Sequence, residues 1–360
     1  MFKGYLKNRK ALIKGYSLKN GALEHQVPVL LLLMVPLIIL FFASFFIGKY
    51  PIPPQDVVMA FAAKIFHTPS NLSPTMELII FQVRLPRILA AILVGAALSV
   101  AGASFQGLFR NPLVSPDKLG VSAGAGFGAC LAILLSMSAV MIQFSALLGG
   151  LLAVALTYSI ARAFRGVSVL KLVLCGIAME TFFAALIATT KYVADPYGQL
   201  QSIVFWLMGS LAKVTNQDVI MIGIPIAAGT IVLLMVRWRI NLLSMGEDEA
   251  KSLGIDIRKM QALVIGCCTL ITASAVSISG IIGWIGLVIP HVARMIVGPD
   301  HKVLLPSSII LGAFFLLLID DVARSLTTIE IPLGILTAMI GAPFFLYLLS
   351  KAMNGWSRDL

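Results

Sequence analysis

Ten long apolar stretches constrain this chain more than any other feature of its sequence. The mean hydropathy is +0.97 over 360 residues and only 12% of the residues are charged, whereas about a quarter are charged in an average soluble domain. A helix of about 20 apolar residues crosses the hydrocarbon core of a bilayer, and the sequence lacks the alternating strands of a membrane β-barrel. The predicted fold class is therefore an all-α polytopic membrane protein. We expect about ten spans, over residues 28–48, 82–107, 118–138, 141–162, 170–191, 218–236, 259–279, 281–296, 303–322 and 332–350.

The segments outside these spans are short. Residues 1–27 are basic and polar, and no small-residue cleavage site follows the first apolar run, so we expect a cytoplasmic segment and a retained first span rather than a signal peptide. A transmembrane domain then covers residues 28–352, and a cytoplasmic tail covers 353–360. The shorter apolar piece at 201–212 predicts an interfacial helix.

The distribution of basic residues predicts the orientation in the membrane. With the N-terminus inside, 20 of the 27 Lys and Arg residues fall in cytoplasmic segments, as the positive-inside rule requires. Both termini are then cytoplasmic. The formal net charge of +11 is explained by this orientation, so no nucleic-acid partner is needed. The basic residues expected outside are Lys49, Lys64, Arg84, Arg87, Lys191, Lys213 and Arg324.

An acidic segment interrupts the apolar pattern between the sixth and seventh spans. Four of the 16 acidic residues, Glu247, Asp248, Glu249 and Asp256, lie within twelve positions of a loop at about 240–258. The pattern predicts a short polar helix that stops near Gly254, because glycine commonly ends helices. Such a helix at the cytoplasmic surface suits docking into a groove on a soluble partner. The alternative is an ordinary solvated loop, and the acidic charge disfavours contact with anionic lipid.

Three arginines lie at the outer ends of spans. Arg84 and Arg87 begin the second span, where they could anchor the helix at the interface or pair with an acidic partner outside. Arg324 ends the ninth span, where it could pair locally with Asp320 and Asp321.

Two polar features interrupt the apolar runs elsewhere. The sequence Arg110-Asn111-Pro112-Leu113 predicts a cytoplasmic turn, because proline breaks helices. Glu180 falls near the middle of the fifth span, where an ionisable group is costly unless it faces partners or water. It could line a polar pathway or serve as a structural hydrogen-bond partner.

The sequence contains no catalytic constellation and no metal site. There is no P-loop, no HExxH and no nucleophile elbow, so any ATP that energises this chain must bind to another one. The cysteines lie inside apolar runs without ligand spacing and are predicted to be packing residues. His291 and His301 flank a turn, at a separation that does not suit a two-histidine site on one helix face.

Four motifs together resemble one family. They are RLPRILAAILVGAALSVAGASFQGLFRNPL, GEDEAKSLGI, GLVIPHVARMIVGPDHK and PLGILTAMIGAPFFLYLL. The chain resembles the permease subunits of binding-protein-dependent ABC importers for iron-siderophores, haem and vitamin B12, from about Pro51 onward. The resemblance implies a ten-span subunit that works as a homodimer in the cytoplasmic (inner) membrane of a bacterium or archaeon. Two cytoplasmic ATPase subunits would bind ATP and Mg²⁺, and a periplasmic or surface-tethered binding protein would dock outside.

The resemblance also implies roles for individual positions. Arg84, Arg87 and Arg324 match arginines that pair with the binding protein. Asn111 and Leu113 match a cytoplasmic gate, and Val167 and Ser168 match a neighbouring gate region. Glu180 matches no family motif, and its role stays open. The ATPase-coupling positions would be Ser244, Met245, Gly246, Glu247, Asp248, Glu249, Ala250, Leu253, Gly254 and Ile255.

No residue decides the cargo. We expect ferric siderophore first, then haem and then cobalamin or a related corrinoid. A different class of function is a stand-alone secondary transporter with Glu180 as its ion site. A membrane-embedded enzyme is disfavoured because no catalytic set is present.

Overall fold

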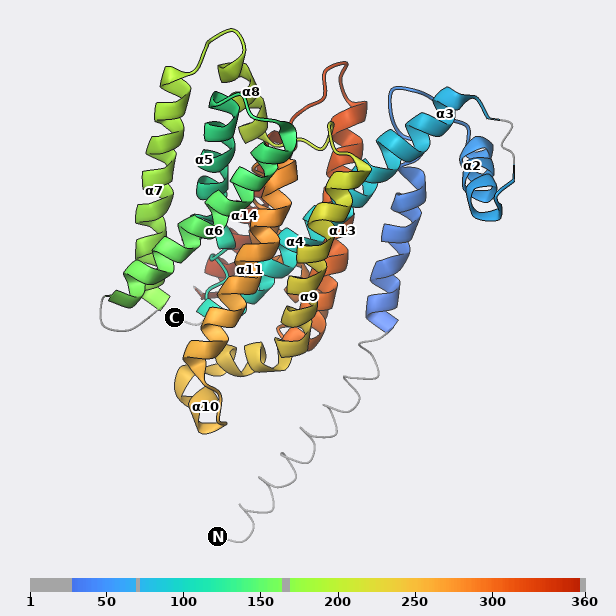
Figure 1. Cartoon of the computed structure of the whole chain (residues 1–360). Coiled ribbons are helices and arrows are strands. Elements are labelled where there is room, and N and C mark those ends of the chain that lie inside the picture. The colour runs from blue at the N-terminus through green and yellow to red at the C-terminus, as the bar shows by residue number, and fades with distance from the viewer. Residues whose placement is uncertain (1–27, 69–71, 164–168, 357–360) are drawn as a thin grey trace, which may run out of the picture.

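The computed structural model describes residues 28–68, 72–163 and 169–356, and every regular element within these ranges is a helix (Figure 1). Val167 and Ser168, two of the predicted gate residues, lie outside the described residues. After the helix Pro28–Ala43 come α2 (Pro54–Phe66), α3 (Pro74–Leu78), the π-helical turn η1 (Ile79–Arg84), α4 (Leu85–Phe109), the 3₁₀ turn η2 (Pro116–Leu119), α5 (Val121–Leu134), α6 (Ala139–Ala163), α7 (Val169–Val193), α8 (Gln199–Met208), α9 (Asn216–Met245), α10 (Glu247–Ser252), α11 (Ile257–Ser279), α12 (Ile285–Val297), α13 (His301–Ser325) and α14 (Leu333–Trp356).

Six of the described helices are long and apolar enough to cross a membrane, and four predicted spans coincide with shorter helices. The six are the continuous helix Pro74–Phe109, α6, Leu170–Val193 within α7, α9, α11 and α13. With 14 and 13 residues, α5 and α12 are each only about 20 Å long at 1.5 Å per residue, shorter than the hydrocarbon core of about 30 Å. A ten-span count therefore stays a prediction.

The two short helices begin later than expected because turns precede them. Residue Gly120 has a φ of 85° and ends η2, so α5 begins at Val121 rather than at 118. Gly280 and Trp284 have φ values of 66° and 72°, so the chain turns through residues 280–284 before α12 begins. Because these backbone angles are incompatible with a right-handed helix, the apolar residues at both places belong to turns.

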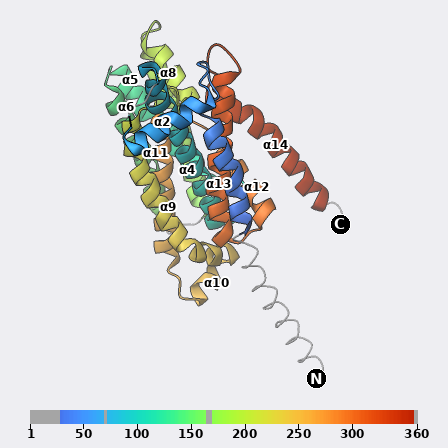
Figure 2. The ribbon, with the colours of Figure 1, turned by 90° about the vertical axis from the view of Figure 1, so that its right-hand side faces the viewer.

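Helix α4 lies at the centre of the fold and packs against α9, α11, α12 and α13 (Figures 1 and 2). Small residues allow these contacts. Gly95 faces Gly312 of α13, and Gly102 faces Gly286 of α12, so closely that a Cβ at either position of α4 would overlap backbone atoms of the neighbouring helix. Such close approach is typical of helix packing in membranes. Helix α14, by contrast, diverges from the bundle toward its C-terminal end (Figure 2).

The turn η1 marks where the RLPR motif enters α4. Pro86 has no N–H and cannot continue the regular hydrogen-bond ladder. The N–H of Leu85 instead donates to the carbonyl of Ile80, five residues earlier. The Phe81 carbonyl, which this shift leaves without a backbone donor, accepts a hydrogen bond from Nδ2 of Asn216 at 3.0 Å. The proline thus produces an irregular turn that ends at Arg84 and precedes Arg87, and α9 compensates for it.

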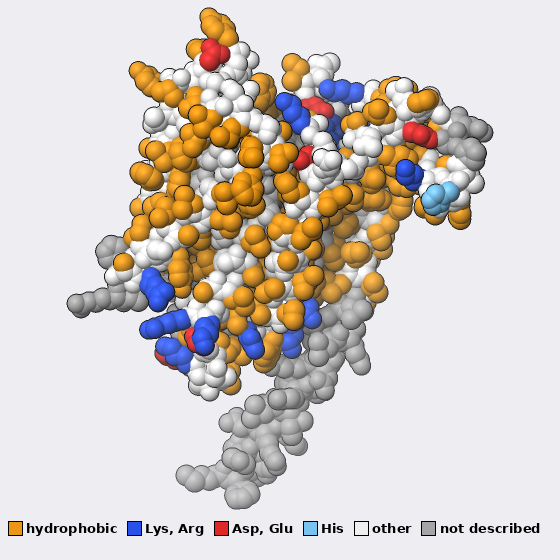
Figure 3. Space-filling view, in the orientation of Figure 1, with side chains coloured by type: hydrophobic (Ala, Val, Ile, Leu, Met, Phe, Trp, Pro, Cys, Tyr) orange, Lys and Arg blue, Asp and Glu red, His pale blue; other side chains and the backbone are white. Residues whose placement is uncertain are grey.

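Charged side chains lie at both ends of the molecule (Figure 3). Lys and Arg side chains surround the end that carries α10, below a broad band of hydrophobic side chains (Figure 3). The N-terminus of α4 and the C-terminus of α13 lie at the opposite end (Figure 1). The two surfaces predicted to bind partners are therefore separated by the length of the bundle.

Candidate functional site

The three predicted docking arginines are buried at the end opposite α10. We call them and their carboxylate partners, Asp320, Asp321 and Glu330, the outer charge cluster. Side chains that anchor a helix at an interface would extend toward water, which these do not. This burial does not test their predicted contact with a binding protein, which stays a prediction.

Arg87 binds two carboxylates. Its Nε lies 3.0 and 2.9 Å from the two carboxylate oxygens of Asp320, whose side chain is 0% exposed. Its second contact is Glu330, where Oε1 accepts from a terminal guanidinium nitrogen at 3.0 Å. Glu330 follows α13 and is 28% exposed. Arg87 therefore has one fixed partner in the protein interior and one partner near the surface.

Arg324 pairs locally, as the alternative interpretation of its sequence predicted. It contacts Asp321 at i−3, and Asp320 at i−4 lies 3.8 Å away, since residues at these spacings share one helix face. Its guanidinium also donates to the carbonyl of Ser44 at 2.7 Å, and the Ser44 hydroxyl donates to Asp321 at 2.6 Å. The helix Pro28–Ala43 is thereby joined to α13 through the residue that follows it.

Arg84 binds backbone rather than carboxylates. Its guanidinium donates to the carbonyls of Phe45 and Tyr50. Gly48, with a φ of 144°, lets the chain pass closely, because a Cβ there would lie 3.1 Å from a guanidinium nitrogen. Arg84 thus holds the segment after the first helix against the start of α4, Arg87 holds α13 there, and Arg324 joins the same segment to α13.

The predicted coupling segment has the form that its sequence indicated. Helix α10 is bounded by Gly246 and by Gly254, whose φ of 78° and N–H bond to the Lys251 carbonyl end the helix. Ile255 closes the same cap by donating to the Ala250 carbonyl. The stop predicted at Gly254 is confirmed.

The exposed face of this segment is both apolar and acidic. Met245 and Leu253 are 69% and 62% exposed, while Ala250 is buried. Asp248 is exposed on α10. Asp256 caps α11 by accepting from the Lys259 backbone N–H at 3.2 Å, and this bond holds the pKa of the Asp256 carboxyl below its usual value. Two large apolar side chains kept in contact with water beside carboxylates are typical of a surface that binds another protein.

The predicted gate turn lies beside this end of α9. Arg110 ends α4 with a φ of 50°. The side-chain oxygen of Asn111 accepts from the Leu113 N–H at 2.9 Å, and Leu113 is exposed. A Cβ at Gly107, one turn earlier, would meet Ile240 of α9. The turn is therefore rigid locally and close to the helix that leads into α10.

Polar contacts not anticipated from the sequence join the helices near α10 to one another. Asn241, near the end of α9, accepts from the His301 N–H at 2.8 Å and donates to Asp300 at 2.5 Å. Arg294 of α12 donates to the side-chain oxygen of Gln106 in α4 at 3.0 Å. A displacement of the end of α9 would thus reach α13 through Asn241 and through Arg237, which donates to the Lys302 carbonyl at 3.1 Å. The partners are about 60 residues apart, so sequence spacing gave no signal for the contact.

Glu180 is half-buried in α7, and its backbone packs beside Gly120. None of the ion pairs in the described part of the chain includes it. Both interpretations of this residue remain predictions.

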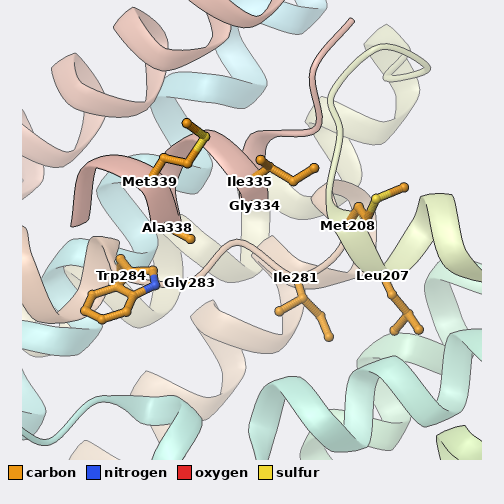
Figure 4. Close-up of a pocket in the computed structure, with 9 residues that line it drawn as sticks. All are labelled: Leu207, Met208, Ile281, Gly283, Trp284, Gly334, Ile335, Ala338 and Met339. Atoms are coloured by element: carbon orange, nitrogen blue, oxygen red, sulfur yellow. The ribbon is translucent and has the colours of Figure 1, made fainter. Parts of the chain in front are cut away.

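An open cavity of about 490 Å³ lies between α8, α14 and the turn before α12 (Figure 4). Leu207, Met208, Ile281, Ile335 and Met339 line it, together with Trp284. The indole N–H is the only polar side-chain group among its lining residues. Because no charged group lines this cavity, it is unsuited to tight binding of an anionic cargo.

Comparison with known proteins identifies the family. A model described as the FecCD transport family matches residues 36–351. The chain belongs to the FecCD transport family. The resemblance inferred from the four motifs is thus confirmed.

Relatives of this FecCD family member differ in their named cargo. The chain is 42% identical over 313 residues to the molybdate import system permease protein MolB of Haemophilus influenzae, covering 87% of this chain and 92% of that protein. It is 45% identical over 279 residues to a probable iron chelatin transport system permease of Helicobacter pylori, covering 77% and 84%. A solved transporter described as of the metal-chelate ABC type, in an inward-facing conformation, superposes with a TM-score of 0.81 at 41% identity, covering 90% of this chain and 99% of that one.

Proposed function

We propose that this chain is the permease subunit of a binding-protein-dependent ABC importer. Two copies would form the translocation pathway, two ATPase subunits would dock on α10, and a substrate-binding protein would dock at the outer charge cluster. ATP would bind to the ATPases, and nothing catalytic is assigned to this chain. The observation that carries the proposal is α10, an exposed acidic helix flanked by the exposed side chains of Met245 and Leu253, at the opposite end from the charge cluster (Figure 1).

The same arrangement supports a mechanism of alternating access. ATP-driven closure of the ATPases would move α10, and Asn241 would pass that displacement to α13. Because α13 carries Asp320, Asp321 and Arg324 at its other end, one rigid helix would connect the motor to the docking surface. The gate residues Asn111 and Leu113 would open as α4 responds.

The proposed orientation places α10 and both termini in the cytoplasm. The basic side chains around α10 (Figure 3) support it, since cytoplasmic segments are enriched in Lys and Arg. The ten-span topology is part of this proposal and is supported by the ten predicted spans, each of which overlaps a helix.

For the cargo we propose a metal-containing anion or chelate, with ferric siderophore first. The similar identities to permeases named for molybdate and for iron chelatin leave this choice to experiment. The chain would be assembled with its ATPase and binding protein in liposomes, and ATP-dependent uptake of ferric siderophore, haem, cobalamin and molybdate would be measured side by side. Uptake that needs no ATPase would contradict the importer and favour a secondary transporter.

The coupling surface gives a direct prediction. Leu253→Asp is expected to lower ATP-dependent uptake at least about tenfold, because a charge would replace an exposed apolar anchor, and anchors of this kind carry most of the binding energy of an interface. Leu253→Ala should have a smaller effect of the same sign. Both are scored by uptake in liposomes and by co-purification of the ATPase.

Lys259→Ala is the matched control, because it removes an exposed side chain near α10 whose ion pair in the described part of the chain is with Asp256. Its uptake should equal that of the unmodified protein. Normal uptake by Leu253→Asp would show that this face does not bind the ATPase.

Glu180→Gln tests whether Glu180 lines the transport pathway or is a structural hydrogen-bond partner. We expect assembly and the melting temperature to be unchanged, since no ion pair of Glu180 would be lost in the described part of the chain. The uptake measurement then assigns the role of Glu180, because uptake by an intact assembly would fall only if the carboxylate lines the transport pathway. Thr181→Ala on the same helix is the control. Failure of Glu180→Gln to assemble would contradict the expectation.

A further inference from the structure

The outer charge cluster already satisfies its own charges. Arg87 and Arg324 face three carboxylates, and Arg84 is bound by two backbone carbonyls. All three guanidinium groups are buried. An acidic partner that approached this surface would therefore find neither an exposed arginine nor a net positive cluster, although opposite charge is what steers and holds such partners.

The carboxylates of the cluster differ in how firmly they are held. Asp320 and Asp321 project from the rigid helix α13 and are 0% and 3% exposed. Glu330 lies in the α13–α14 loop (residues 326–332), which has no regular structure. Its contact with Arg87 is the outermost of the cluster, because its side chain is 28% exposed, although its Oε2 atom is buried. Of these three groups, Glu330 can leave with the least disturbance.

The α13–α14 loop is attached at few points. Besides Glu330, Lys49 donates to the Thr328 carbonyl at 2.7 Å, and the N–H groups of Leu326 and Ile331 donate to the Val322 and Ala323 carbonyls at 3.1 and 3.3 Å. The Ile331 side chain also packs against the core. The loop projects at the end opposite α10 (Figure 1). Leu326 and Ile329 on it are 60% and 78% exposed. Two exposed apolar side chains beside a replaceable ion pair have the chemistry of an interface centre.

We infer that the Glu330 carboxylate occupies a position on Arg87 that a carboxylate of the docking protein takes when the two proteins bind. The α13–α14 loop then moves aside and carries Glu330 away from Arg87. This inference rests on the proposed function and adds to it the residue that limits docking affinity. The exchange avoids leaving a buried arginine unpaired, which would be costly. Asp320 stays on Arg87 throughout and keeps the guanidinium in position.

Charge reversal of the arginines cannot test docking. A carboxylate in place of Arg87 or Arg324 would lie buried against the carboxylates that the arginine had paired with, and the protein would not fold. Glu330→Gln avoids this problem. Glutamine has the same shape and can still accept from Arg87, but it leaves the cluster one positive charge in excess. We expect the cognate binding protein to bind the ATPase-bound Glu330→Gln transporter in nanodiscs about fivefold more tightly than it binds the unmodified transporter. This ratio corresponds to the loss of one ion pair of about 1 kcal/mol. Docking should also weaken more steeply with added NaCl than for the unmodified protein.

A second measurement needs no partner. Backbone amides of residues 326–331 should exchange hydrogen faster in Glu330→Gln than in the unmodified transporter, because one of the few attachments of the loop is weakened. Asp195→Asn is the matched control. It removes an exposed carboxylate from the segment between α7 and α8 without touching an arginine of the cluster, and it should change neither the docking affinity nor the exchange of the loop.

The outcomes separate the two proposals. Unchanged or weaker docking by Glu330→Gln, while the unmodified transporter docks normally, would overturn the role of Glu330 and leave the importer intact. An equal gain in Asp195→Asn would attribute the effect to general surface charge and would also overturn it. Absence of docking by the unmodified transporter would overturn the proposed function and this inference together.

Discussion

Gly102→Ala is expected to lower the stability of the folded protein by about 2–3 kcal/mol, as overpacking of a close-packed interior does. A Cβ at this position would lie 1.8 Å from the carbonyl oxygen of Gly286 and 2.6 Å from its Cα. Both are backbone atoms, so no side-chain rotation can make room. Helix α12 would have to move away from α4, which would also stretch the bonds from Gln106 to the Gly286 and Leu287 carbonyls at 3.4 and 3.3 Å.

The measurement is the melting temperature of the purified protein in detergent, with size-exclusion chromatography to detect aggregation. Gly266→Ala in α11 is the matched control, since a Cβ there meets nothing within 4 Å. Alanine is the better helix former by about 1 kcal/mol, so the control should melt at the same temperature or higher. If Gly102→Ala melted as the control does, the close contact between α4 and α12 would not be essential to the fold.

The positions of the helices could be predicted from the sequence because the apolar pattern is a local signal. The end of α10 at Gly254 was predictable for the same reason, since a left-handed glycine and its cap lie within a few residues of the helix. The late start of α12 was not, because Trp284 is an apolar residue with a φ of 72°. Apolar composition indicates burial there, but a turn is imposed by tertiary contacts rather than by residue type.

The arginines show where sequence reasoning reaches its limit. Their position at span ends was predicted, and Arg324 could be paired with its own helix because its partners lie at i−3 and i−4. The partners of Arg87 are 233 and 243 residues away. Glu330 lies just before the motif that begins at Pro332 and carried no signal of its own, since a single carboxylate in a loop is usually solvated. Only the packing of α4 against α13 brings the two together.

That packing makes Asp320→Asn the substitution with the largest expected effect. Asparagine preserves the shape of the side chain but removes the charge that both oxygens present to Nε of Arg87 at 2.9 and 3.0 Å. Arg324, 3.8 Å away, loses part of its compensation too. Removing one partner of a buried ion pair costs about 3–5 kcal/mol, which is a large part of the stability of a typical domain. We expect a markedly lower melting temperature or failure to accumulate in the membrane.

A double-mutant cycle separates the ion pair from general damage to the packing. Arg87→Met combined with Asp320→Asn should be less destabilised than the sum of the two single variants, by at least about 1 kcal/mol, because the second substitution removes a charge that the first left unpaired. Lys259→Ala, which breaks the exposed pair with Asp256, should leave the melting temperature unchanged. Additive effects of the two buried substitutions would mean that Arg87 and Asp320 stabilise the protein independently, and the outer charge cluster would then be a set of separate contacts rather than one coupled network.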